Sequence, residues 1–382
     1  MKNNRTFLEK LLEGSEVEWK PLDEVANIVN NARKPVKSSL RVSGNIPYYG
    51  ANNIQDYVEG YTHEGEFVLI AEDGSASLEN YSIQWAVGKF WANNHVHVVN
   101  GKEKLNNRFL YHYLTNMNFI PFLAGKERAK LTKAKLQQIP IPIPPLSVQT
   151  EIVKILDALT ALTSELTSEL TSELILRQKQ YEYYREKLLS HNDSENSSQQ
   201  KVDKDKLFST SNIQWLHLNE IYKFQYGIGN KIPTIGGEYP VYGSNGIVGS
   251  HNEYNSEDAP VIGHIGAYAG IVNWAEGKHF VTYNGIICNK INDNVNSRYA
   301  YYLLLSQNFI DKANKASQPF ISYDILNKCI VPVPPIEEQQ RIVSILDKFE
   351  TLTNSITEGL PLAIEQSQKR YEYYRELLLN FS

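Results

Sequence analysis

Residues 178–186 read QKQYEYYRE, and residues 368–376 read QKRYEYYRE. The same offset of 190 residues (368 minus 178) relates two Pro-rich runs, IPIPP at 141–145 and VPVPP at 331–335. Between these matches, further residues recur at the same offset: Gln149, Ile152, Leu156 and Asp157 return as Gln339, Ile342, Leu346 and Asp347. A long internal repeat of this kind outweighs local patterns, so we interpret the chain as two copies of one unit.

Residues 147–189 are mostly helix formers with no interior Gly or Pro, which predicts one helix about 60 Å long. Each Pro favours extended geometry in the residue before it, so the IPIPP run predicts an extended strap that leads into this helix. In the second copy, Gly359 and Pro361 interrupt the pattern. They predict a kink or break near Pro361, with the helix resuming before Glu365.

A stripe of aliphatic residues at four-residue spacing lies on each predicted helix. A step of four residues overshoots one helical turn by about 40°, so such a stripe drifts around the helix. We expect the two stripes to pack against each other in antiparallel helices; the alternative is two separate helices, each covering its own domain. The expected packing residues are Leu162, Leu166, Leu170, Leu174, Leu352, Ile356, Leu360 and Ile364.

The two globular segments match more weakly, but in the same order. Trp19 parallels Trp215, PYYGAN at 47–52 parallels PVYGSN at 240–245, Gly88-Lys89 parallels Gly277-Lys278, and Arg108 parallels Arg298. Short apolar runs at 67–71, 95–99, 260–263 and 285–288 lie between Gly/Asn turns and predict strands, whereas 108–114 and 298–305 predict helices.

These patterns predict an α+β (mixed α/β) fold. Two similar globular domains are joined by two long antiparallel coiled-coil helices with pseudo-twofold symmetry. The expected boundaries are 1–146 for the first domain, 147–190 for the first helix, 191–206 for a polar linker, 207–336 for the second domain and 337–382 for the second helix, kinked near Pro361.

The composition restricts the class of protein. A formal net charge of −5 argues against a simple nucleic-acid protein, so any DNA affinity must come from local patches or partners. Only Cys288 and Cys329 are present, which is typical of a reducing compartment. No apolar run approaches the roughly 18 residues of a membrane span, and we expect a cytoplasmic protein without a membrane partner.

The order of globular domain, helix, globular domain and helix resembles the specificity subunit of type I restriction-modification systems, and the resemblance covers nearly all of the chain. It is carried by the Pro-rich strap before each helix, the repeated YEYYRE box, and the tract TSELTSELTSEL at residues 163–174. In that family, the copy number of such a tract alters the spacing between two half-sites in DNA. Four helical residues add about 6 Å, nearly two base pairs of roughly 3.4 Å each.

The resemblance implies that each globular domain is a target recognition domain for one half of a bipartite site in double-stranded DNA. The helices set the half-site spacing and dock two modification subunits, which methylate adenine using S-adenosylmethionine. Added restriction subunits make the complex an ATP-dependent endonuclease. By the same resemblance, this chain binds no cofactor and has no catalytic residue.

The motifs of the sequence agree with that expectation. The sequence contains no Asn-Pro-Pro-aromatic methyltransferase motif, no phosphate-binding loop and no two-Cys zinc pair. His95 and His97 alternate on a presumed strand, but without a third ligand they favour an ordinary pair over a metal site. The spacing Gly243-x-x-Gly246-x-x-Gly249 favours a turn between short strands over a phosphate cradle.

Candidates for DNA contact are clusters of Lys and Arg with amide side chains nearby, since cations neutralise phosphates and amides can pair with adenine. A solvated surface is the alternative for each residue, and Asn52 and Asn53 also fit a conformational role in a turn. The first domain offers Arg33, Lys34, Lys37, Arg41, Asn52 and Asn53, then Lys126, Arg128, Lys130, Lys133 and Lys135. The second offers Lys223, Lys231, Asn245, Asn284, Lys312, Lys315 and Gln318.

Two functions from different classes fit these observations. The first is a DNA-binding specificity subunit; the second is a non-catalytic protein-interaction scaffold with a helical rod, for which the acidic balance is the main clue. Binding of the assembled complex to duplex DNA at low salt separates them, because phosphate contacts are strongest there.

Overall fold

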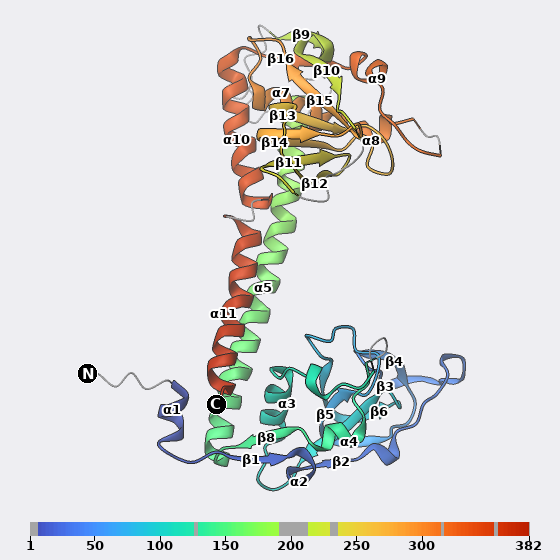
Figure 1. Cartoon of the computed structure of the whole chain (residues 1–382), viewed down its shortest axis with the longest axis vertical. Helices are drawn as coiled ribbons and strands as arrows, with labels where there is room; N and C mark the ends of the chain where they lie inside the picture. The colour runs from blue at the N-terminus through green and yellow to red at the C-terminus, as the bar shows by residue number, and fades with distance from the viewer. Residues whose placement is uncertain are drawn as a thin grey trace, which may run out of the picture. The chain divides into compact units, whose positions relative to one another are not determined.

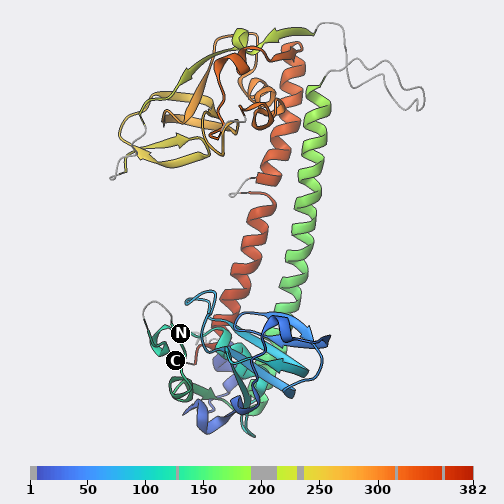
Figure 2. The same cartoon turned by 90° about the vertical axis from the view of Figure 1, so that its right-hand side faces the viewer.

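The computed structural model of the chain describes residues 7–125, 129–190, 213–229, 236–314, 317–354 and 358–381 (Figures 1 and 2). It forms two compact units. Unit 1 comprises Met1–Leu170 and Ile364–Ser382, and unit 2 comprises Thr171–Ala363. Each unit contains a mixed α/β domain and part of the long helical segment, in agreement with the predicted fold class.

The sheet of unit 1 has six strands in the order β2-β7-β5-β6-β3-β4. Neighbouring strands are antiparallel except β3 and β6, which are parallel. The strands are β2 (Ala26–Ile28), β3 (Ser43–Tyr49), β4 (Ile54–Val58), β5 (His63–Ala71), β6 (Ile83–Ala92) and β7 (Val96–Gly101). The short helices are α1 (Phe7–Leu12), α2 (Leu22–Val25), α3 (Asn107–Thr115) and α4 (Lys133–Gln137).

Both faces of this sheet are covered. Val68 and Ile70 of β5 belong to an apolar cluster that includes Phe109 of α3, whereas Leu69 belongs to a second cluster with Phe90. Successive residues of a strand face opposite sides, so the alternation shows one core on each face. Val68, Leu69 and Ile70 are all fully buried.

Unit 2 repeats this topology with the strand order β10-β15-β13-β14-β11-β12, again with one parallel pair, β11 and β14. Its strands are β10 (Tyr222–Tyr226), β11 (Tyr239–Gly243), β12 (Gly246–His251), β13 (Ser256–Gly263), β14 (Val272–Val281) and β15 (Gly285–Lys290). Its short helices are α6 (Leu218–Ile221), α7 (Ser297–Ser306), α8 (Phe309–Lys312) and α9 (Tyr323–Asn327). The spacing of Gly243, Gly246 and Gly249 belongs to the β11–β12 hairpin, as predicted.

A two-stranded ribbon leads into each long helix. In unit 1, β1 (Glu18–Pro21) pairs with β8 (Pro140–Ile143), and in unit 2, β9 (Gln214–His217) pairs with β16 (Ile330–Val333). Proline is tolerated here because a two-stranded ribbon leaves half of its backbone groups unpaired. The extended strap predicted from the Pro-rich runs is therefore β8 and β16.

The helical segment consists of α5 (Leu146–Leu189), α10 (Ile336–Asn354) and α11 (Leu360–Leu379). α5 is a single helix of 44 residues. The second copy is divided, and Gly359 has a φ of +97°, a left-handed conformation that glycine adopts readily. Gly359 directly precedes α11, and Pro361 is the second residue of that helix.

The helices pair in antiparallel fashion inside each unit (Figures 1 and 2). In unit 1, Thr160 of α5 donates a 3.1 Å hydrogen bond to the Tyr371 hydroxyl of α11, and Ile152 shares a core with Leu378. In unit 2, Tyr184 of α5 stacks on Phe349 of α10 at 5.6 Å between ring centroids. Antiparallel pairing was expected, and the alternative of two separate helices is wrong.

The pairing face of α5 differs from the predicted leucine stripe. Leu162 and Leu166 are 63% and 43% exposed, whereas Leu170 and Leu174 are half-buried. The other half-buried positions of the tract are Thr163, Thr167 and Glu173. Contact between two helices requires an average step near 3.5 residues, which 163, 167, 170 and 174 satisfy and a constant step of four does not. On the partner helices, Leu352, Leu360 and Ile364 are half-buried, and Ile356 lies outside the described residues.

Three further expectations concern the chain as a whole. The expected linker 191–206 lies outside the described residues. Cys288 and Cys329 are buried free cysteines. Within the described ranges, no helix has the length and apolar character needed to cross a membrane.

Candidate nucleic-acid interface

The residues that follow β5 in unit 1 and β13 in unit 2 make equivalent backbone hydrogen bonds, which we call the backbone frame. Glu72 N–H donates to His95 O at 2.8 Å, and His264 N–H donates to Asn284 O at 2.8 Å. The carbonyls of Glu72 and His264 in turn accept 2.8 Å hydrogen bonds from Leu131 N and Ile321 N. Two of the three side-chain positions on these hydrogen bonds differ between the units: Glu72 and His95 of unit 1 correspond to His264 and Asn284 of unit 2, whereas Leu131 and Ile321 are both buried aliphatic residues. We call this region the variable edge, with Arg33, Glu72, His95 and Lys130 in unit 1 and Tyr226, His264, Asn284 and Tyr323 in unit 2.

The variable edge of unit 1 is a network of charges. Arg33 donates to Glu72 at 2.7 Å and to Val96 O at 2.7 Å, and its side chain is only 17% exposed. Lys130 pairs with the other carboxylate oxygen of Glu72 at 2.9 Å. Glu72 therefore joins the two basic clusters that the sequence identified separately.

The ionisation of Glu72 follows from this position. Burial opposes its negative charge, but the hydrogen bonds from Arg33 and Lys130 outweigh burial and lower its pKa. The same hydrogen bond raises the pKa of Lys130. Both groups are therefore charged at neutral pH, and Arg33 and Lys130 already have a carboxylate partner.

The variable edge of unit 2 is aromatic. Tyr226 stacks on Tyr323 at 4.3 Å and lies 4.4 Å from the ring of His264. Tyr283, which is exposed, lies 5.8 Å from Tyr226. The backbone of Gly266 donates to Pro319 O at 2.8 Å, which places the exposed Gln318 beside the same loop. The candidates Asn284 and Gln318 therefore both lie beside the segment 264–266, at an edge whose tyrosines were not among the predicted site residues.

The remaining residues of the first basic cluster have two kinds of environment. Arg41 lies over the Tyr48 ring at 4.1 Å, donates to Val36 O at 3.1 Å and is 14% exposed. Lys34 and Lys37 are exposed. Together with Trp91, which donates to Lys34 O at 2.7 Å, Lys34, Arg41 and Tyr48 line a cavity of about 430 Å³. Arg33 and Arg41 thus support the loop from which Lys34 and Lys37 reach solvent.

Asn52 acts within the fold. Its amide donates to Gly74 O at 2.9 Å, and its carbonyl oxygen accepts from Ala76 N at 2.8 Å and from Ser82 Oγ at 2.6 Å. The Asn53 carbonyl accepts from Gly50 N at 2.9 Å. The conformational role considered for this pair therefore explains Asn52, while the Asn53 side chain is exposed.

The other candidates are scattered over the two domains. Lys133 and Lys135 are exposed on α4, Lys223 is exposed on β10, and Asn245 is exposed in the β11–β12 turn. Lys312 is exposed and donates to Gln307 Oε1 at 3.0 Å. Lys126, Arg128, Lys231 and Lys315 lie outside the described residues.

The two histidines considered for a metal site have separate roles. His97 is fully buried and bridges Asn30, at 2.9 Å, and Leu131 O, at 2.7 Å. Burial lowers the pKa of His97, partly opposed by the Leu131 hydrogen bond and the Glu72 charge. His95 instead bonds Asp73 at 2.5 Å. Across the described ranges, no group of three His, Cys, Asp or Glu side chains is arranged to hold a metal ion.

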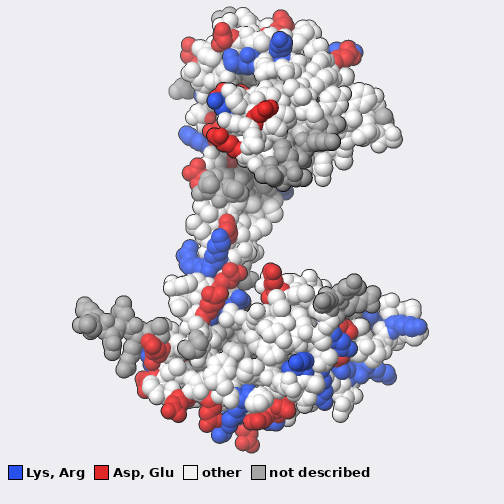
Figure 3. All heavy atoms as spheres, viewed as in Figure 1, with Lys and Arg blue, Asp and Glu red and all other residues white. Residues whose placement is uncertain are grey.

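Charge is distributed unevenly over the face in view in Figure 3. Lys and Arg side chains gather on the sheet-containing part of unit 1, mixed with Asp and Glu, whereas much of the visible sheet-containing part of unit 2 is uncharged.

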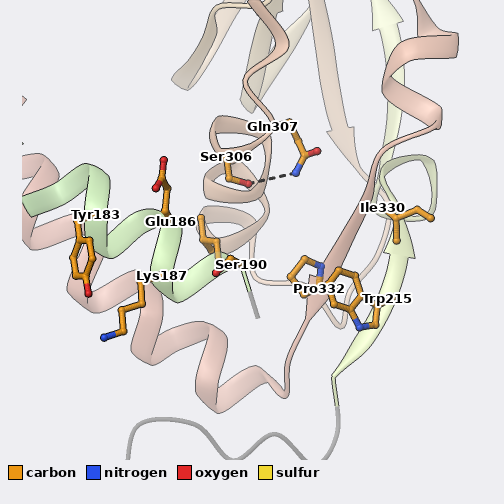
Figure 4. Close-up of a pocket in the computed structure, with 10 residues that line it drawn as sticks. Tyr183, Glu186, Lys187, Ser190, Trp215, Ser306, Gln307, Ile330 and Pro332 are labelled. Carbon is orange, nitrogen blue, oxygen red and sulfur yellow. Dashed lines mark hydrogen bonds between the residues drawn. The ribbon is translucent and has the colours of Figure 1, made fainter. Parts of the chain in front are cut away.

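A second exposed surface lies on the helices. The YEYYRE boxes present Tyr183 and Tyr373, each 57% exposed, and in both copies the adjacent tyrosine ring packs edge-on at 5.4 Å. In unit 2, Tyr183, Glu186 and Lys187 of α5 line a groove of about 550 Å³ whose opposite wall includes Trp215 and Ile330 of the ribbon (Figure 4).

Comparison with known proteins identifies the family. The family model described as "Type I restriction modification DNA specificity domain" matches residues 14–176 and 218–366. A putative type I restriction enzyme specificity subunit of Haemophilus influenzae is 66% identical over the full length of both chains. The EcoR124I/EcoR124II specificity subunit of Escherichia coli is 32% identical over 98% of this chain and 97% of its own.

Solved structures agree at the level of fold. A chain from a study of complex assembly and conformational transition of the type I R-M system matches with a TM-score of 0.62 at 15% identity, over 96% of this chain and 98% of that chain. The S subunit from M. genitalium matches with a TM-score of 0.52 at 17% identity, over 99% and 96%. With two family-model matches, two repeated sheet domains and full-length relatives, this chain belongs to the family of type I restriction-modification specificity subunits.

Proposed function

We propose that each sheet domain of this specificity subunit reads one half of a bipartite site in double-stranded DNA, with its variable edge and neighbouring loops facing the bases. The observation that carries the proposal is one backbone frame with unrelated side chains in the two units: ionic around Glu72 and aromatic around His264. Two readers with the same framework and different reading groups suit an asymmetric target.

The candidate contacts divide into two roles under this proposal. Exposed cations, namely Lys34, Lys37, Lys133 and Lys223, would bind phosphates, and amides such as Asn245, Asn284 and Gln318 would face base edges. Arg33, Arg41 and Lys130 would act mainly by holding the loops in place, because each already has a protein carboxylate as partner.

We propose that α5 sets the distance between the half-sites. Removing one TSEL repeat, residues 163–166, shortens the helix by about 6 Å and rotates its C-terminal remainder by about 40° beyond a full turn. The test maps methylated adenines in DNA exposed to the complex of this chain with its modification subunits. We expect two short sequences with a fixed gap, and a gap shorter by about two base pairs after the deletion.

A matched control keeps the length of the tract. Ser164→Ala with Ser168→Ala alters two exposed positions without removing a residue, and the gap should then stay at its original value. An unchanged gap after the deletion, or a methylated sequence that is not split, would contradict the proposal.

We also propose that two modification subunits dock on the helices, one at each YEYYRE box. The exposed tyrosine pairs Tyr183–Tyr184 and Tyr373–Tyr374 support this, since aromatic side chains are enriched at the centres of protein interfaces. Methyl transfer from S-adenosylmethionine and the ATP-dependent steps of restriction subunits would then take place on the partners, and this chain would itself carry no catalytic group.

The interaction-scaffold alternative is not favoured by the family to which the chain belongs. It makes a different prediction for the assembled complex. A gel shift at low salt should show binding to duplex DNA, and failure to bind there would support the scaffold instead.

A further inference from the structure

Each unit contains an ion pair between its domain and its long helix. In unit 1, Arg108 near the start of α3 donates from Nε to Asp157 of α5 at 2.8 Å. In unit 2, Arg298 near the start of α7 donates from Nη2 to Asp347 of α10 at 3.0 Å. The two pairs lie at corresponding positions of the repeat, because both residues are related by the offset of 190.

The same guanidinium groups also contact the sheet. Arg108 lies 5.1 Å from the Trp85 ring of β6 and 4.6 Å from Tyr111. Arg298 lies 5.2 Å from the Trp274 ring of β14 and 4.9 Å from Tyr301. A guanidinium is planar and can stack on a ring while donating in its plane. Sheet, domain helix and long helix therefore meet at one side chain in each unit.

A second polar attachment lies eight residues earlier on each long helix (157 minus 149, and 347 minus 339). The fully buried Gln149 accepts from Asn106 N at 2.8 Å and donates to Pro144 O at 2.8 Å. Gln339 accepts from Asn296 N at 2.7 Å and donates to Pro334 O at 2.8 Å.

Eight residues correspond to about 12 Å along a helix. A single attachment would leave the domain free to pivot about it, whereas two attachments at this separation fix the direction in which the domain leaves the helix.

The residues around Arg108 and Arg298 differ between the units, so the contacts that both units share can be distinguished from those that only one unit has. In unit 1, His112 Nε2 hydrogen-bonds the same Asp157 oxygen at 2.8 Å. In unit 2, the corresponding residue is Tyr302, which donates to Asp347 at 2.5 Å and to Glu350 at 2.7 Å. The Arg–Asp pair, the aromatic rings that stack on Arg, and the glutamine with its backbone partners are common to both units.

We propose that Arg108 and Arg298 are positioning residues that make each recognition domain rigid on its helix and so determine how strictly the complex measures the gap between half-sites. This inference rests on the proposed function. A helix can measure distance only as accurately as its attached readers are held. Loss of the planar, stacked donor should loosen the measurement without changing the bases read.

The experiment uses the full chain assembled with its modification subunits. A DNA library carries the two half-sites at the natural gap and at gaps one and two base pairs longer or shorter, and methylation is read by sequencing. Arg108→Lys and Arg298→Lys keep the charge but lose the stacking plane. We expect the preference for the natural gap to fall by about tenfold, the factor for the lost stacking of the guanidinium on its rings, with both half-site sequences unchanged.

The matched control is Glu151→Gln on the same helix. Glu151 pairs with Lys154 at 3.8 Å within α5 and does not connect the helix to the domain, so the gap preference should stay as in the wild type. Asp157→Asn removes the charge of the other partner of the Arg108–Asp157 ion pair. It should lower the preference for the natural gap in the same way, and it tests the inference even if the Arg108→Lys chain does not assemble.

Two outcomes would count against different proposals. Equal loss of methylation at every gap in the lysine and asparagine variants would show that these residues act only through stability, and it would overturn the inference. A wild-type complex that recognises no split site would instead contradict the proposed function.

Discussion

Arg33 and Lys37 are four residues apart on one loop, yet their surroundings give them different roles. Arg33 is held by Glu72, Val96 O and Asn30 O, whereas Lys37 is exposed. From the sequence they form one basic cluster, because charge alone does not reveal which cation has a buried partner. The contacts separate a residue that supports the loop from one that is available to a phosphate.

Lys37→Ala should weaken DNA binding without affecting the fold. Loss of one phosphate contact should lower affinity for all sequences alike and reduce the slope of log K against log salt concentration by about 1. Binding titrations of the assembled complex at several salt concentrations measure both. Unchanged affinity and slope would remove Lys37 from the interface.

Arg33→Ala should instead lower the stability of unit 1, so it is the comparison for Lys37→Ala, which should weaken DNA binding and leave the fold unchanged. It leaves Glu72 without one of its two cations and removes the guanidinium hydrogen bond to Val96 O, at an expected cost of about 2–3 kcal/mol in the free energy of unfolding of unit 1. Denaturant unfolding measures this cost. A stability equal to that of the wild type would contradict the structural role.

His97 should make unit 1 less stable in mild acid. Burial lowers its pKa in the folded state, so the unfolded chain binds a proton more readily below the ordinary value of about 6.5. The stabilisation is therefore present above that pH and is lost as pH falls towards the folded-state pKa. An NMR titration of the His97 ring should give a midpoint below that of a free histidine, and a midpoint at or above it would contradict this expectation.

Along α5, burial follows contact with the domain core and the partner helices rather than hydrophobicity alone. Leu156 is fully buried, but Leu162 is largely exposed, although both are leucines of one helix. Two neighbouring positions of the tract, Thr163 and Thr167, are half-buried instead. The polar content of the tract suits a helix whose length matters more than the stability of its packing.

Leu156→Ala should therefore destabilise unit 1 by about 2–5 kcal/mol, the usual cost of a large-to-small change in a core. Leu162→Ala removes the same atoms from an exposed position, and its effect should stay within about 0.5 kcal/mol. Denaturant midpoints compare the two directly. Similar losses in both variants would show that Leu162 packs as the stripe predicts.

The sequence predicts the elements that repeat or are strongly periodic. α5, the division of the second helical copy between α10 and α11, α3, α7 and the central strands β5, β7, β13 and β15 all lie where the patterns indicate. Strands β3, β4, β11 and β12 are harder to recognise, because they have exposed faces and many Gly, Asn and Tyr residues that weaken a regular alternation.

The site is less predictable than the fold for a physical reason. The variable edge is assembled from the end of one strand, a loop after another and the start of a short helix, so its members are far apart in the chain. The repeat could have indicated some of these residues. Arg108, Gln149 and Asp157 are polar residues that recur among apolar ones, as expected for contacts that attach a domain to its long helix. Side chains that differ between the copies have no such signal.

At the scale of the whole molecule, unit 1 is made from two separate stretches of chain. Leu378 and Leu379 of α11 are buried in the same cluster as Leu8, Ile152 and Phe109. Unit 2 has a corresponding pair, Leu188 and Leu189 of α5, in its own cluster. Each core therefore includes the C-terminal end of a long helix, and in unit 1 this end comes from a distant part of the sequence.

Leu378→Ala with Leu379→Ala should destabilise unit 1 specifically. Hydrogen exchange should become faster in β5 and β7, with β13 and β15 unchanged, because the lost contacts lie in the cluster of unit 1. Leu188→Ala with Leu189→Ala is the matched variant, and it should reverse the pattern. Faster exchange in both sheets for either variant would contradict the separate cores.

The number of docked partners tests the repeat at the same scale. If each box docks one modification subunit as proposed, Tyr183→Ala should leave one subunit in the complex and Tyr373→Ala should leave the other. Tyr184 is kept because it stacks on Phe349 within unit 2. Native mass spectrometry counts the subunits. Two subunits retained in both variants would exclude the boxes as docking sites.

The contribution of α11 to the core of unit 1 also bears on synthesis. Strands β1 to β8 emerge from the ribosome early, but the residues that close their apolar cluster emerge only after all of unit 2 has been translated. The nascent first domain thus keeps an open apolar surface while its sibling is being made. The domain translated first is the last to be finished, so a prematurely terminated product cannot contain a complete copy of it.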